Sequence, residues 1–324
     1  GAPKNCIQWI DNPSKEATSD LMNHKNVATI LATGGNAMVK AAYSCGKPAL
    51  GVGAGNVPAY MEKTCNVRQA VNDIVMSKAF DNGMICASEQ CVIIDKEIEK
   101  TSIELFKKYG VYFVSSEEKT KLEQFMFNTT SSSGACNPDA NLNPAVVGRD
   151  AKWIAEQAGF KVPEGTILLG VYVKEIGPKE PMTKEKLSTV LAFITSKSTQ
   201  EGLLYAKQMV DFNGLGHSAA IHTESKEIAD EFALMVKAIR VIWNSPSTFG
   251  GIGNVYNAFI PSLTLGCGSY GHNSVSNNVS AINLLNIKRL GRRNNNMQWF
   301  KIPSKIYFER NSIQYLQQMK DVER

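Results

Sequence analysis

The chain has 324 residues, of which 43% are hydrophobic and 20% are charged, and its formal net charge at pH 7 is +5. This length and composition are ordinary for a soluble globular protein of about two domains. The mild and mostly dispersed positive charge argues against nucleic acid as the main partner and is better suited to a phosphate-bearing small molecule.

Membrane insertion, disulfide bonding and metal binding are not expected either. No apolar run approaches the roughly 20 residues that a membrane span needs. The seven cysteines form an odd set without a CxxC pair, which favours reduced thiols and a cytoplasmic location. His24, His222 and His272 have no potential ligands at metal spacing, so no metal site is predicted.

The first elements are expected to alternate between strand and helix. Apolar residues predict a strand at 6–10, Asn12 is the expected N-cap of a helix that runs to about His24, and a second strand covers 27–33. Because Gly1 is followed so closely by the first strand, we expect earlier strands of the same domain upstream of it. The sheet edge left open predicts pairing with another copy, in a homo-oligomer or a filament.

A glycine pair separates the strand at 27–33 from a following helix. Thr33, Gly34 and Gly35 occupy this turn. Glycines let a pyrophosphate approach the backbone closely, and the N-terminus of a helix directs N–H groups and partial positive charge at an anion. The turn lacks the GxGxxG spacing, however, and a junction of this kind is more often only a tight turn. Both interpretations stay open.

The most informative stretch is a turn that presents Cys86 between a helix and a buried strand. One apolar face predicts the helix at 67–79, and the strand is predicted at 91–94. A partly exposed loop position near backbone N–H groups favours the thiolate and can receive an oxyanion, which makes Cys86 a candidate nucleophile. The alternative is a small buried hydrophobe, as most free cysteines are.

The rest of the chain continues an α/β pattern. Ser115 with Glu118 predicts a capping box at a helix start, and residues 128–144 predict a long surface loop. Residues 247–253 predict a glycine loop, and 263–269 a mobile polar stretch. Two short strands with exposed aromatic residues are expected near the C-terminus, carrying Trp299, Phe300, Ile306, Tyr307 and Phe308.

The residues around Cys86 resemble a known family. Phe80 and Asn82-Gly83, with the cysteine three residues after the glycine, resemble the nucleophile loop of the aldehyde dehydrogenase superfamily. The longer string from Ser77 to Gln90 is similar to the CoA-acylating branch, and most similar to the aldehyde dehydrogenase half of bifunctional aldehyde-alcohol dehydrogenases. The likeness extends over nearly the whole chain. It implies an α/β, aldehyde dehydrogenase-like fold: a partial Rossmann-type cofactor domain and an α/β catalytic domain, with the N-terminal part missing.

The resemblance also implies roles for the glycine-rich turns. Thr33, Gly34 and Gly35 correspond to cofactor contacts, and Gly51 and Gly53 belong to a second glycine run that begins about 35 residues before the cysteine. In hydrolytic members a glutamate heads this run and activates water. Because Gly51 or a neighbour replaces it, the acyl-enzyme would wait for a thiol such as coenzyme A. The alternative is that Gly51 is merely a turn glycine.

Two further side chains take roles by resemblance. Glu185 corresponds to a glutamate that holds the nicotinamide ribose through its hydroxyls, although a charged residue before a strand is usually just solvated. His217, in Gly-Leu-Gly-His, corresponds to a histidine tied to acyl-CoA chemistry, and an imidazole titrating near neutrality could deprotonate coenzyme A. A purely structural histidine is an equally good interpretation.

The domains implied are the C-terminal part of an NAD-binding domain at 1–56, a cysteine-bearing catalytic domain at 57–250, a return segment packing near the active site at 251–297, and a linker or assembly tail at 298–324 that leads toward an absent alcohol dehydrogenase domain.

The implied reaction converts acetaldehyde, CoA and NAD to acetyl-CoA and NADH, run in reverse in fermentation to ethanol. Two alternatives are another acyl-CoA or acyl-phosphate reductase of this fold, and a filament or interface module without turnover of its own. The isolated chain is expected to have little turnover.

Overall fold

The computed structural model describes residues 1–130 and 141–292, and its contacts divide the chain into a unit at Gly1–Leu284 and a second at Leu285–Arg324. All the helices and strands of the described residues belong to the first unit. The predicted aromatic strands and the predicted tail at 298–324 lie outside the described residues, as does most of the predicted loop at 128–144. The predicted domain boundaries at 56 and 250 stay predictions.

The N-terminal part of the first unit contains a small parallel sheet. Strands β1 (Ile30–Thr33) and β2 (Ala49–Val52) pair in parallel, and helix α2 (Asn36–Ser44) connects them. A crossover of this kind is what two consecutive parallel strands require. Helix α1 (Lys15–Asn23) precedes them. Buried apolar side chains form a local core from Ile30, Ala32, Ala42 and Ala49.

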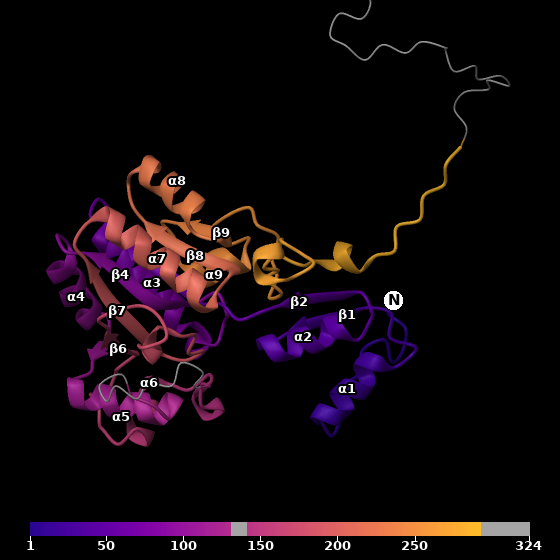
Figure 1. The fold of residues 1–324 in the computed structure, drawn as a ribbon, viewed down its shortest axis with the longest axis horizontal. Helices are drawn as coiled ribbons and strands as arrows, with labels where there is room; N and C mark the ends of the chain where they lie inside the picture. The colour runs from indigo at the N-terminus through magenta and orange to yellow at the C-terminus, as the bar shows by residue number, and fades with distance from the viewer. Residues whose placement is uncertain (131–140, 293–324) are drawn as a thin grey trace, which may run out of the picture. The chain divides into compact units, whose positions relative to one another are not determined.

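A seven-stranded parallel sheet dominates the first unit, in the order β5-β6-β7-β4-β3-β8-β9 (Figure 1). Its strands are β3 (Val57–Met61), β4 (Glu89–Asp95), β5 (Val111–Phe113), β6 (Leu168–Tyr172), β7 (Val190–Ser196), β8 (Gly216–His222) and β9 (Ala238–Trp243). Its helices are α3 (Val67–Ala79), α4 (Glu99–Lys108), α5 (Ser116–Phe127), α6 (Ala151–Gln157), α7 (Thr199–Asn213), α8 (Lys226–Met235) and α9 (Ser247–Ile252).

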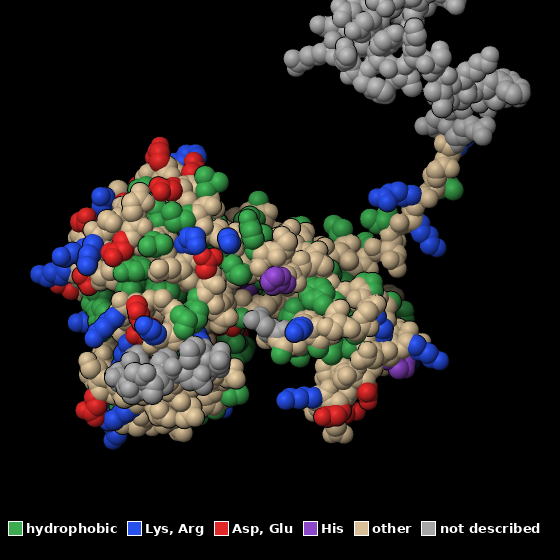
Figure 2. All heavy atoms as spheres, viewed as in Figure 1, with side chains coloured by type: hydrophobic (Ala, Val, Ile, Leu, Met, Phe, Trp, Pro, Cys, Tyr) green, Lys and Arg blue, Asp and Glu red, His purple; other side chains and the backbone are tan. Residues whose placement is uncertain are grey.

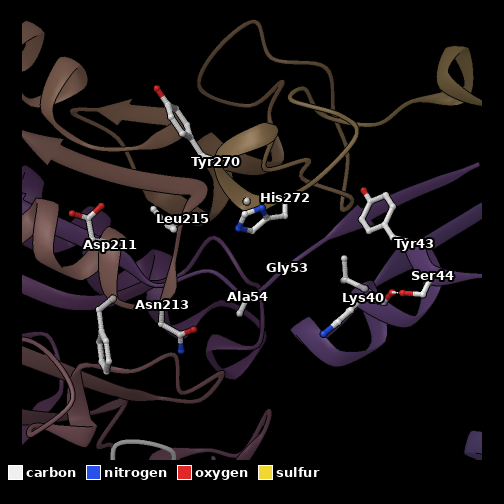
Figure 3. A pocket seen from close by; sticks show the side chains of 13 residues that line it. Lys40, Tyr43, Ser44, Gly53, Ala54, Asp211, Asn213, Leu215, Tyr270 and His272 are labelled. Atoms are coloured by element: carbon white, nitrogen blue, oxygen red, sulfur yellow. Dashed lines mark hydrogen bonds between the residues drawn. The ribbon is translucent and has the colours of Figure 1, made fainter.

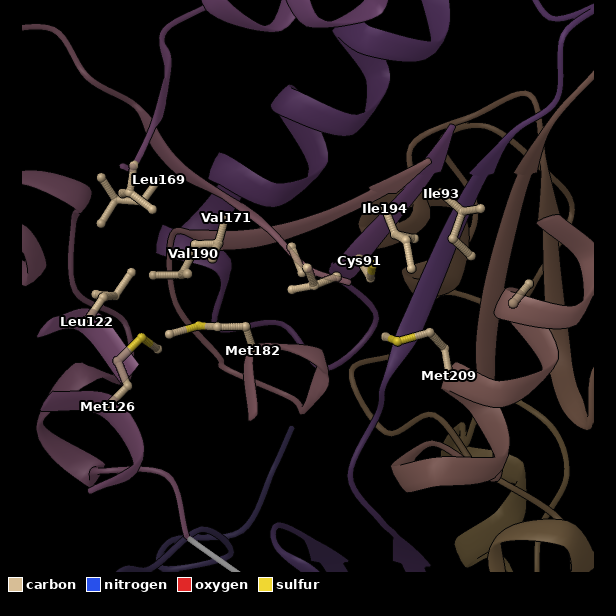
Figure 4. Close-up of a cluster of buried hydrophobic side chains, with 14 of the residues drawn as sticks. Cys91, Ile93, Leu122, Met126, Leu169, Val171, Met182, Val190, Ile194 and Met209 are labelled. Carbon is tan, nitrogen blue, oxygen red and sulfur yellow. The ribbon is translucent and has the colours of Figure 1, made fainter. Parts of the chain in front are cut away.

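Both faces of this sheet are buried. In β4, Cys91 and Ile93 belong to one apolar core and Val92 and Ile94 to the other, as the alternation of side chains along a strand requires. The first core contains residues from α5, α6, α7 and α8, and part of it is drawn in Figure 4. The second contains residues from α3 and α4. Burial on both faces explains why the central strands are continuous apolar runs.

Several predicted elements are confirmed. Helix α3 has the predicted bounds and buries the predicted apolar face, and the strand predicted at 91–94 is the centre of β4. The capping box of α5 is complete, because Ser115 Oγ accepts the Glu118 N–H and Glu118 Oε2 accepts the Ser115 N–H. The parallel α/β architecture is as expected.

Near the N-terminus two predictions are wrong. Residues 6–10 do not form a strand: Ile7 and Trp9 are 83% and 81% exposed, and no strand among the described residues pairs with them. Helix α1 begins later than predicted, because Ser14 rather than Asn12 is its N-cap and accepts the Ala17 N–H at 3.0 Å.

Two predictions for the later glycine-rich segments are also wrong. Residues 247–252 form helix α9 rather than a loop, and its first N–H groups donate to Glu89 Oε1 at 2.9 Å and Ser77 Oγ at 2.8 Å. Buried acceptors at the helix start make the helical turn favourable. The stretch at 263–269 is not a mobile polar segment, because Leu265 and Cys267 are fully buried.

The surface carries both signs of charge. Figure 2 shows Lys and Arg side chains interspersed with Asp and Glu over the part that contains the seven-stranded sheet. Within residues 1–130 and 141–292, no helix is long and apolar enough to cross a membrane.

Candidate active site

A left-handed turn holds Cys86 in place at the end of α3. Asp81, Asn82 and Gly83 have φ angles of +49°, +49° and +71°, a conformation that glycine adopts freely and that Asp and Asn tolerate better than other residues. The Asn82 amide donates to Gly148 O at 3.0 Å. A Cβ atom at Gly83 would lie 2.2 Å from Ser188 O. The turn is therefore pressed against the segment that carries Glu185, and only glycine fits.

One cavity of about 280 Å³ contains most of the predicted site residues. Cys86 and Glu185 line it together with Gly34 and Gly35 at the start of α2. The predicted residues that line it are Thr33, Gly34, Gly35, Gly53, Cys86 and Glu185. Its apolar wall consists of Val52, Ala54, Met84, Ile85, Leu187, Ile252, Leu263 and Leu265. Segments far apart in the sequence thus meet around the thiol.

Gly51 is the predicted cofactor residue that does not line this cavity. It lies in β2 under α2, where a Cβ atom would be 2.6 Å from Val39 Cγ1 and 2.7 Å from Tyr43 Cε2. Its N–H donates to the Tyr43 hydroxyl at 2.9 Å. A glycine here allows the helix to pack closely on the strand, and a cofactor contact at Gly51 stays a prediction.

The surroundings of the Cys86 thiol do not favour its ionisation. Burial raises its pKa to about 12, and negative charge on Glu185 and Cys267 acts in the same direction. The Arg240 guanidinium opposes these effects and lowers the pKa. The expectation that this loop position favours the thiolate is therefore wrong: the surrounding protein groups together favour the protonated thiol.

The Glu185 carboxyl titrates near neutrality. Burial raises its pKa to about 7, while the hydrogen bond from the Gly55 N–H and the charges of Lys78 and Lys186 act in the opposite direction. The Gly55 N–H donates to Glu185 Oε1 at 3.0 Å. Both protonation states are thus populated near neutral pH, and the ionised state makes Cys86 harder to ionise.

His217 is fully buried at the start of β8. Its Nδ1 lies 3.0 Å from Ser218 Oγ, and its Nε2 has no hydrogen-bond partner among the described residues. Burial, followed by the positive charge of Arg240, lowers its pKa to about 3. The expectation that His217 titrates near neutrality is therefore wrong. The imidazole is neutral at physiological pH.

Gly55 separates His217 from the nucleophile loop. A Cβ atom at Gly55 would lie 2.2 Å from Cys86 O and 3.1 Å from His217 Nδ1. Its N–H also holds Glu185. The missing side chain at this position lets three predicted site residues approach one another. This role of Gly55 was not predicted, because residues 51–56 contain three glycines and the sequence does not distinguish among them.

A buried polar network, also missed, joins the nucleophile loop to the Glu185 segment. Ser88 Oγ donates to Gly83 O at 3.1 Å, and Gln90 Nε2 donates to Ser88 O at 3.1 Å. Gln90 Oε1 accepts the Lys186 N–H at 3.0 Å, and Lys186 Nζ donates to Gln90 O at the same distance. The network therefore fixes the residue next to Glu185 relative to the turn that holds Cys86.

Two lysines of this network are fully buried. Lys186 Nζ also donates to Met182 O at 2.7 Å and Lys184 O at 2.9 Å, and burial lowers its pKa to about 7. Lys78 lies within 3.5 Å of Ser88 Oγ and 3.4 Å of Gln90 Oε1, and burial lowers its pKa well below the usual range. The sequence carries a signal for Lys78, since it continues the apolar face of α3.

Two further residues of the site, Arg240 and Cys267, were not predicted from the sequence. Arg240 is 3% exposed and lies in β9 between apolar neighbours, which is itself an unusual sequence pattern for a buried strand. Cys267 is fully buried. Burial raises the pKa of its thiol, whereas a hydrogen bond from the Gly53 N–H and the charge of Arg240 lower it.

A second cavity, of about 560 Å³, adjoins the first at Gly53 and Ala54, which line both. Figure 3 shows His272 near its centre, with Lys40 and Tyr43 of α2 on one side and Asn213 and Leu215 on the other. It is the larger of the two, but Cys86 and Glu185 do not line it. The chemistry therefore belongs to the smaller cavity.

No cluster of metal-ligating side chains is present among the residues that the structure describes.

The sequence is similar to those of known proteins. The family model described as aldehyde dehydrogenase family matches residues 1–254. The aldehyde-alcohol dehydrogenase of Streptococcus pneumoniae serotype 4 is 68% identical over 324 residues, which are 100% of this chain and 37% of that protein. The chain thus spans 37% of the length of this curated relative.

Solved structures show the same likeness. An acetylating aldehyde dehydrogenase from Geobacillus thermoglucosidasius has a TM-score of 0.83 and 41% sequence identity, covering 94% of this chain and 64% of that one. A propionaldehyde dehydrogenase from Rhodopseudomonas palustris, solved with bound propionyl-CoA, has a TM-score of 0.68 and 26% identity, covering 82% of this chain and 55% of that one.

Proposed function

Because the chain belongs to the aldehyde dehydrogenase family, we propose that it provides the nucleophile and part of the cofactor site of a CoA-acylating aldehyde dehydrogenase. The observation that carries this proposal is the cavity that joins Cys86 and Glu185 to the N-terminal end of α2. The likeness to an acetylating enzyme and to one with bound propionyl-CoA supports coenzyme A as the acyl acceptor.

The cavity suits a nicotinamide nucleotide, which we propose is NAD. Gly34 and Gly35 leave the first turn of α2 accessible from the cavity, and a Cβ atom at Gly35 would meet nothing within 4 Å. N–H groups at a helix start favour a phosphate. Glu185 lies on the same wall and can accept hydrogen bonds from ribose hydroxyls. When bound, the nicotinamide ring accepts or returns the hydride of the reaction.

The proposed reaction proceeds through a thioester on Cys86. Its sulfur, once deprotonated, adds to the aldehyde carbon to form a thiohemiacetal anion, which would collapse to the acyl thioester by giving its hydride to the bound nicotinamide. The thiol of coenzyme A then attacks the thioester carbon, its proton passes to the departing Cys86 sulfur, and acyl-CoA is released. The raised pKa of Cys86 means that its thiol proton must leave to solvent as the sulfur adds to the carbonyl, because the ionised Glu185 in the same cavity disfavours the thiolate.

His217 is proposed to act in the coenzyme A half of the reaction. Its Nε2 has no partner among the described residues and it is separated from the Cys86 loop only by Gly55. A neutral imidazole can accept a hydrogen bond from an incoming thiol, although its low pKa makes it a weak base. It would therefore orient the thiol rather than ionise it beforehand.

The direction and setting of the reaction are further parts of the proposal. We propose that acetyl-CoA and acetaldehyde are the physiological pair, with reduction of the thioester as part of ethanol fermentation. The likeness to an aldehyde-alcohol dehydrogenase supports this direction.

The described cysteines are unpaired, which suits a reducing, cytoplasmic compartment. A homo-oligomer or filament is proposed from the exposed apolar residues, which include Leu234 and Val255.

The decisive experiment identifies the acylated residue. The protein is incubated with acetyl-CoA or with acetyl phosphate, and the acetylated peptide is mapped by mass spectrometry. We expect acetyl-CoA to label Cys86, with no label in Cys86→Ala and full label in Cys45→Ala, a control at another partly exposed cysteine. Labelling that persists in Cys86→Ala would contradict the proposal, and labelling by acetyl phosphate alone would favour an acyl-phosphate reductase.

A further inference from the structure

A buried arginine is hydrogen-bonded to His217 of the proposed active site. Arg240 uses three of its N–H groups on neutral acceptors: Nε donates to Asn278 Oδ1 at 2.7 Å, Nη1 donates to His217 O at 2.9 Å, and Nη2 donates to Gly266 O. Its guanidinium therefore fixes the start of β8 and the residue before Cys267. The first of these segments adjoins the nucleophile loop, because a Cβ atom at Gly55 would lie 3.1 Å from His217 Nδ1 and 2.2 Å from Cys86 O.

The positive charge of Arg240 has no carboxylate partner in the part of the chain that the structure describes. The ion pairs there all involve lysines. An arginine cannot shed its proton in a protein, so its charge remains. A buried charge without a counter-ion is costly, and residues of this kind are concentrated at functional sites.

The groups that experience this charge are those of the proposed site. Arg240 interacts electrostatically with the thiols of Cys86 and Cys267 and with the His217 imidazole. Around Cys86 the other ionisable groups are Glu185 and Cys267, whose negative charge opposes ionisation of the thiol. Arg240 thus offers Cys86 the positive charge that an anionic sulfur needs, and it adds to the effect of burial that keeps His217 neutral.

We propose that Arg240 is a positioning residue of the active site, which anchors His217 and the segment before Cys267 and supplies the positive charge that favours the thiolate of Cys86. This inference rests on the proposed role of Cys86. The charge that stabilises the thiolate would then come from β9, which is far in the sequence from the loop that carries Cys86. The same charge would favour the oxygen anion that forms when the thiolate adds to a carbonyl.

The test measures the ionisation of the thiol directly and does not require turnover. The protein is alkylated with iodoacetamide at a series of pH values, and the rate at Cys86 is followed by mass spectrometry of its peptide. Arg240→Met removes the charge. Asn278→Asp keeps the arginine and gives it a carboxylate partner at the present hydrogen-bond position, while it removes the bonds that Asn278 Nδ2 donates to the carbonyl oxygens of Gly251, Ile252 and Ile260. Arg240→Lys keeps a positive charge and loses part of the hydrogen bonding.

We expect alkylation of Cys86 at pH 8 to be about tenfold slower in Arg240→Met and in Asn278→Asp, which corresponds to a rise of about one unit in the pKa of the thiol. Arg240→Lys should stay within about threefold of the unchanged protein, and Arg68→Met, which removes an exposed arginine, should match it. Circular dichroism checks that each variant is folded.

Asn278→Asp decides the outcome if Arg240→Met does not fold. A folded Asn278→Asp protein with an unchanged alkylation profile would overturn the proposal. So would an Arg240→Lys protein as slow as Arg240→Met, because hydrogen bonding rather than charge would then control the thiol. If the profile shifts as expected but acetyl-CoA fails to label Cys86, the proposed function fails while the electrostatic role of Arg240 stands.

Discussion

Lys186 donates two hydrogen bonds to Gln90, one from its backbone and one from its side chain. The Lys186 N–H donates to Gln90 Oε1 and Lys186 Nζ donates to Gln90 O, both at 3.0 Å. Because Gln90 also donates to Ser88 O, and Lys186 follows Glu185 in the chain, this pair links the nucleophile loop to the Glu185 segment. Precise placement of reacting groups is a large part of catalysis.

We expect Lys186→Met to destabilise the protein and to weaken cofactor binding. Its Nζ donates to three carbonyl oxygens, of which those of Gln90 and Met182 are buried, and leaving such groups unpaired costs about 2 kcal/mol or more. Urea unfolding measures the loss, and the KM for NAD should rise because Glu185 is no longer held. Lys152→Met, at an exposed lysine of α6, is the control. Equal stability of the two variants would contradict the structural role of Lys186.

Gly55→Ala should reduce activity severely. The added methyl group would lie 2.2 Å from Cys86 O, a distance that forces the nucleophile loop to move. We expect acetylation of Cys86 by acetyl-CoA to slow by about 100-fold, in keeping with the cost of small displacements of reacting groups. Gly291→Ala, where an added Cβ meets nothing within 4 Å, is the matched control. Normal acetylation of Gly55→Ala would show that the close approach is not needed.

Glu185→Gln should make Cys86 more reactive at alkaline pH. Above pH 7 the carboxylate is largely ionised and raises the pKa of the thiol, whereas below pH 7 it is protonated and has little effect. We therefore expect alkylation of Cys86 at pH 9 to be about three- to tenfold faster in the variant, and nearly equal at pH 6. Glu164→Gln, at an exposed glutamate, serves for comparison. A difference of the same size at both pH values would point to altered access instead.

His217→Ala should slow the transfer of the acyl group to coenzyme A more than it slows hydride transfer. Loss of a group that orients or accepts a proton typically costs about 10² in rate. Single-turnover formation of NADH from acetaldehyde should persist, while release of acetyl-CoA falls. His24→Ala, at an exposed histidine, controls for general effects. Loss of the NADH burst together with steady turnover would show that His217 is needed earlier.

His222→Gln should make the protein more resistant to mild acid. His222 is 2% exposed, and burial lowers its pKa to about 4. The unfolded chain takes up a proton near its ordinary pKa of about 6.5, so the folded state loses stability as pH falls from there to about 4. Between pH 6.5 and 5 this amounts to about 2 kcal/mol.

Urea unfolding at several pH values measures this slope. It should be shallower in His222→Gln, and His24→Gln should retain the slope of the unchanged protein. The same slope in His222→Gln would show that the buried imidazole does not cause the acid sensitivity.

Local patterns determined much of this protein. The apolar face at 67–79, the buried run at 91–94 and the Ser115–Glu118 capping box became α3, β4 and the start of α5, because each depends on residues close together in the chain. The turn Asn82-Gly83 before Cys86 also indicated the family, and the aldehyde dehydrogenase model matches residues 1–254.

Tertiary contacts decided the rest. Whether the glycines at 34, 51, 53 and 55 meet a ligand, a helix or another loop depends on what the fold places opposite them, and only Gly51 lies beneath a tyrosine ring. The pKa of Cys86 follows from burial and from the charges of Glu185 and Cys267, opposed by Arg240, and the pKa of His217 follows from burial and from Arg240. Glu185, Cys267 and Arg240 are all distant from Cys86 in the sequence. Burial and long-range charge are properties of the packed structure, and no local pattern encodes them.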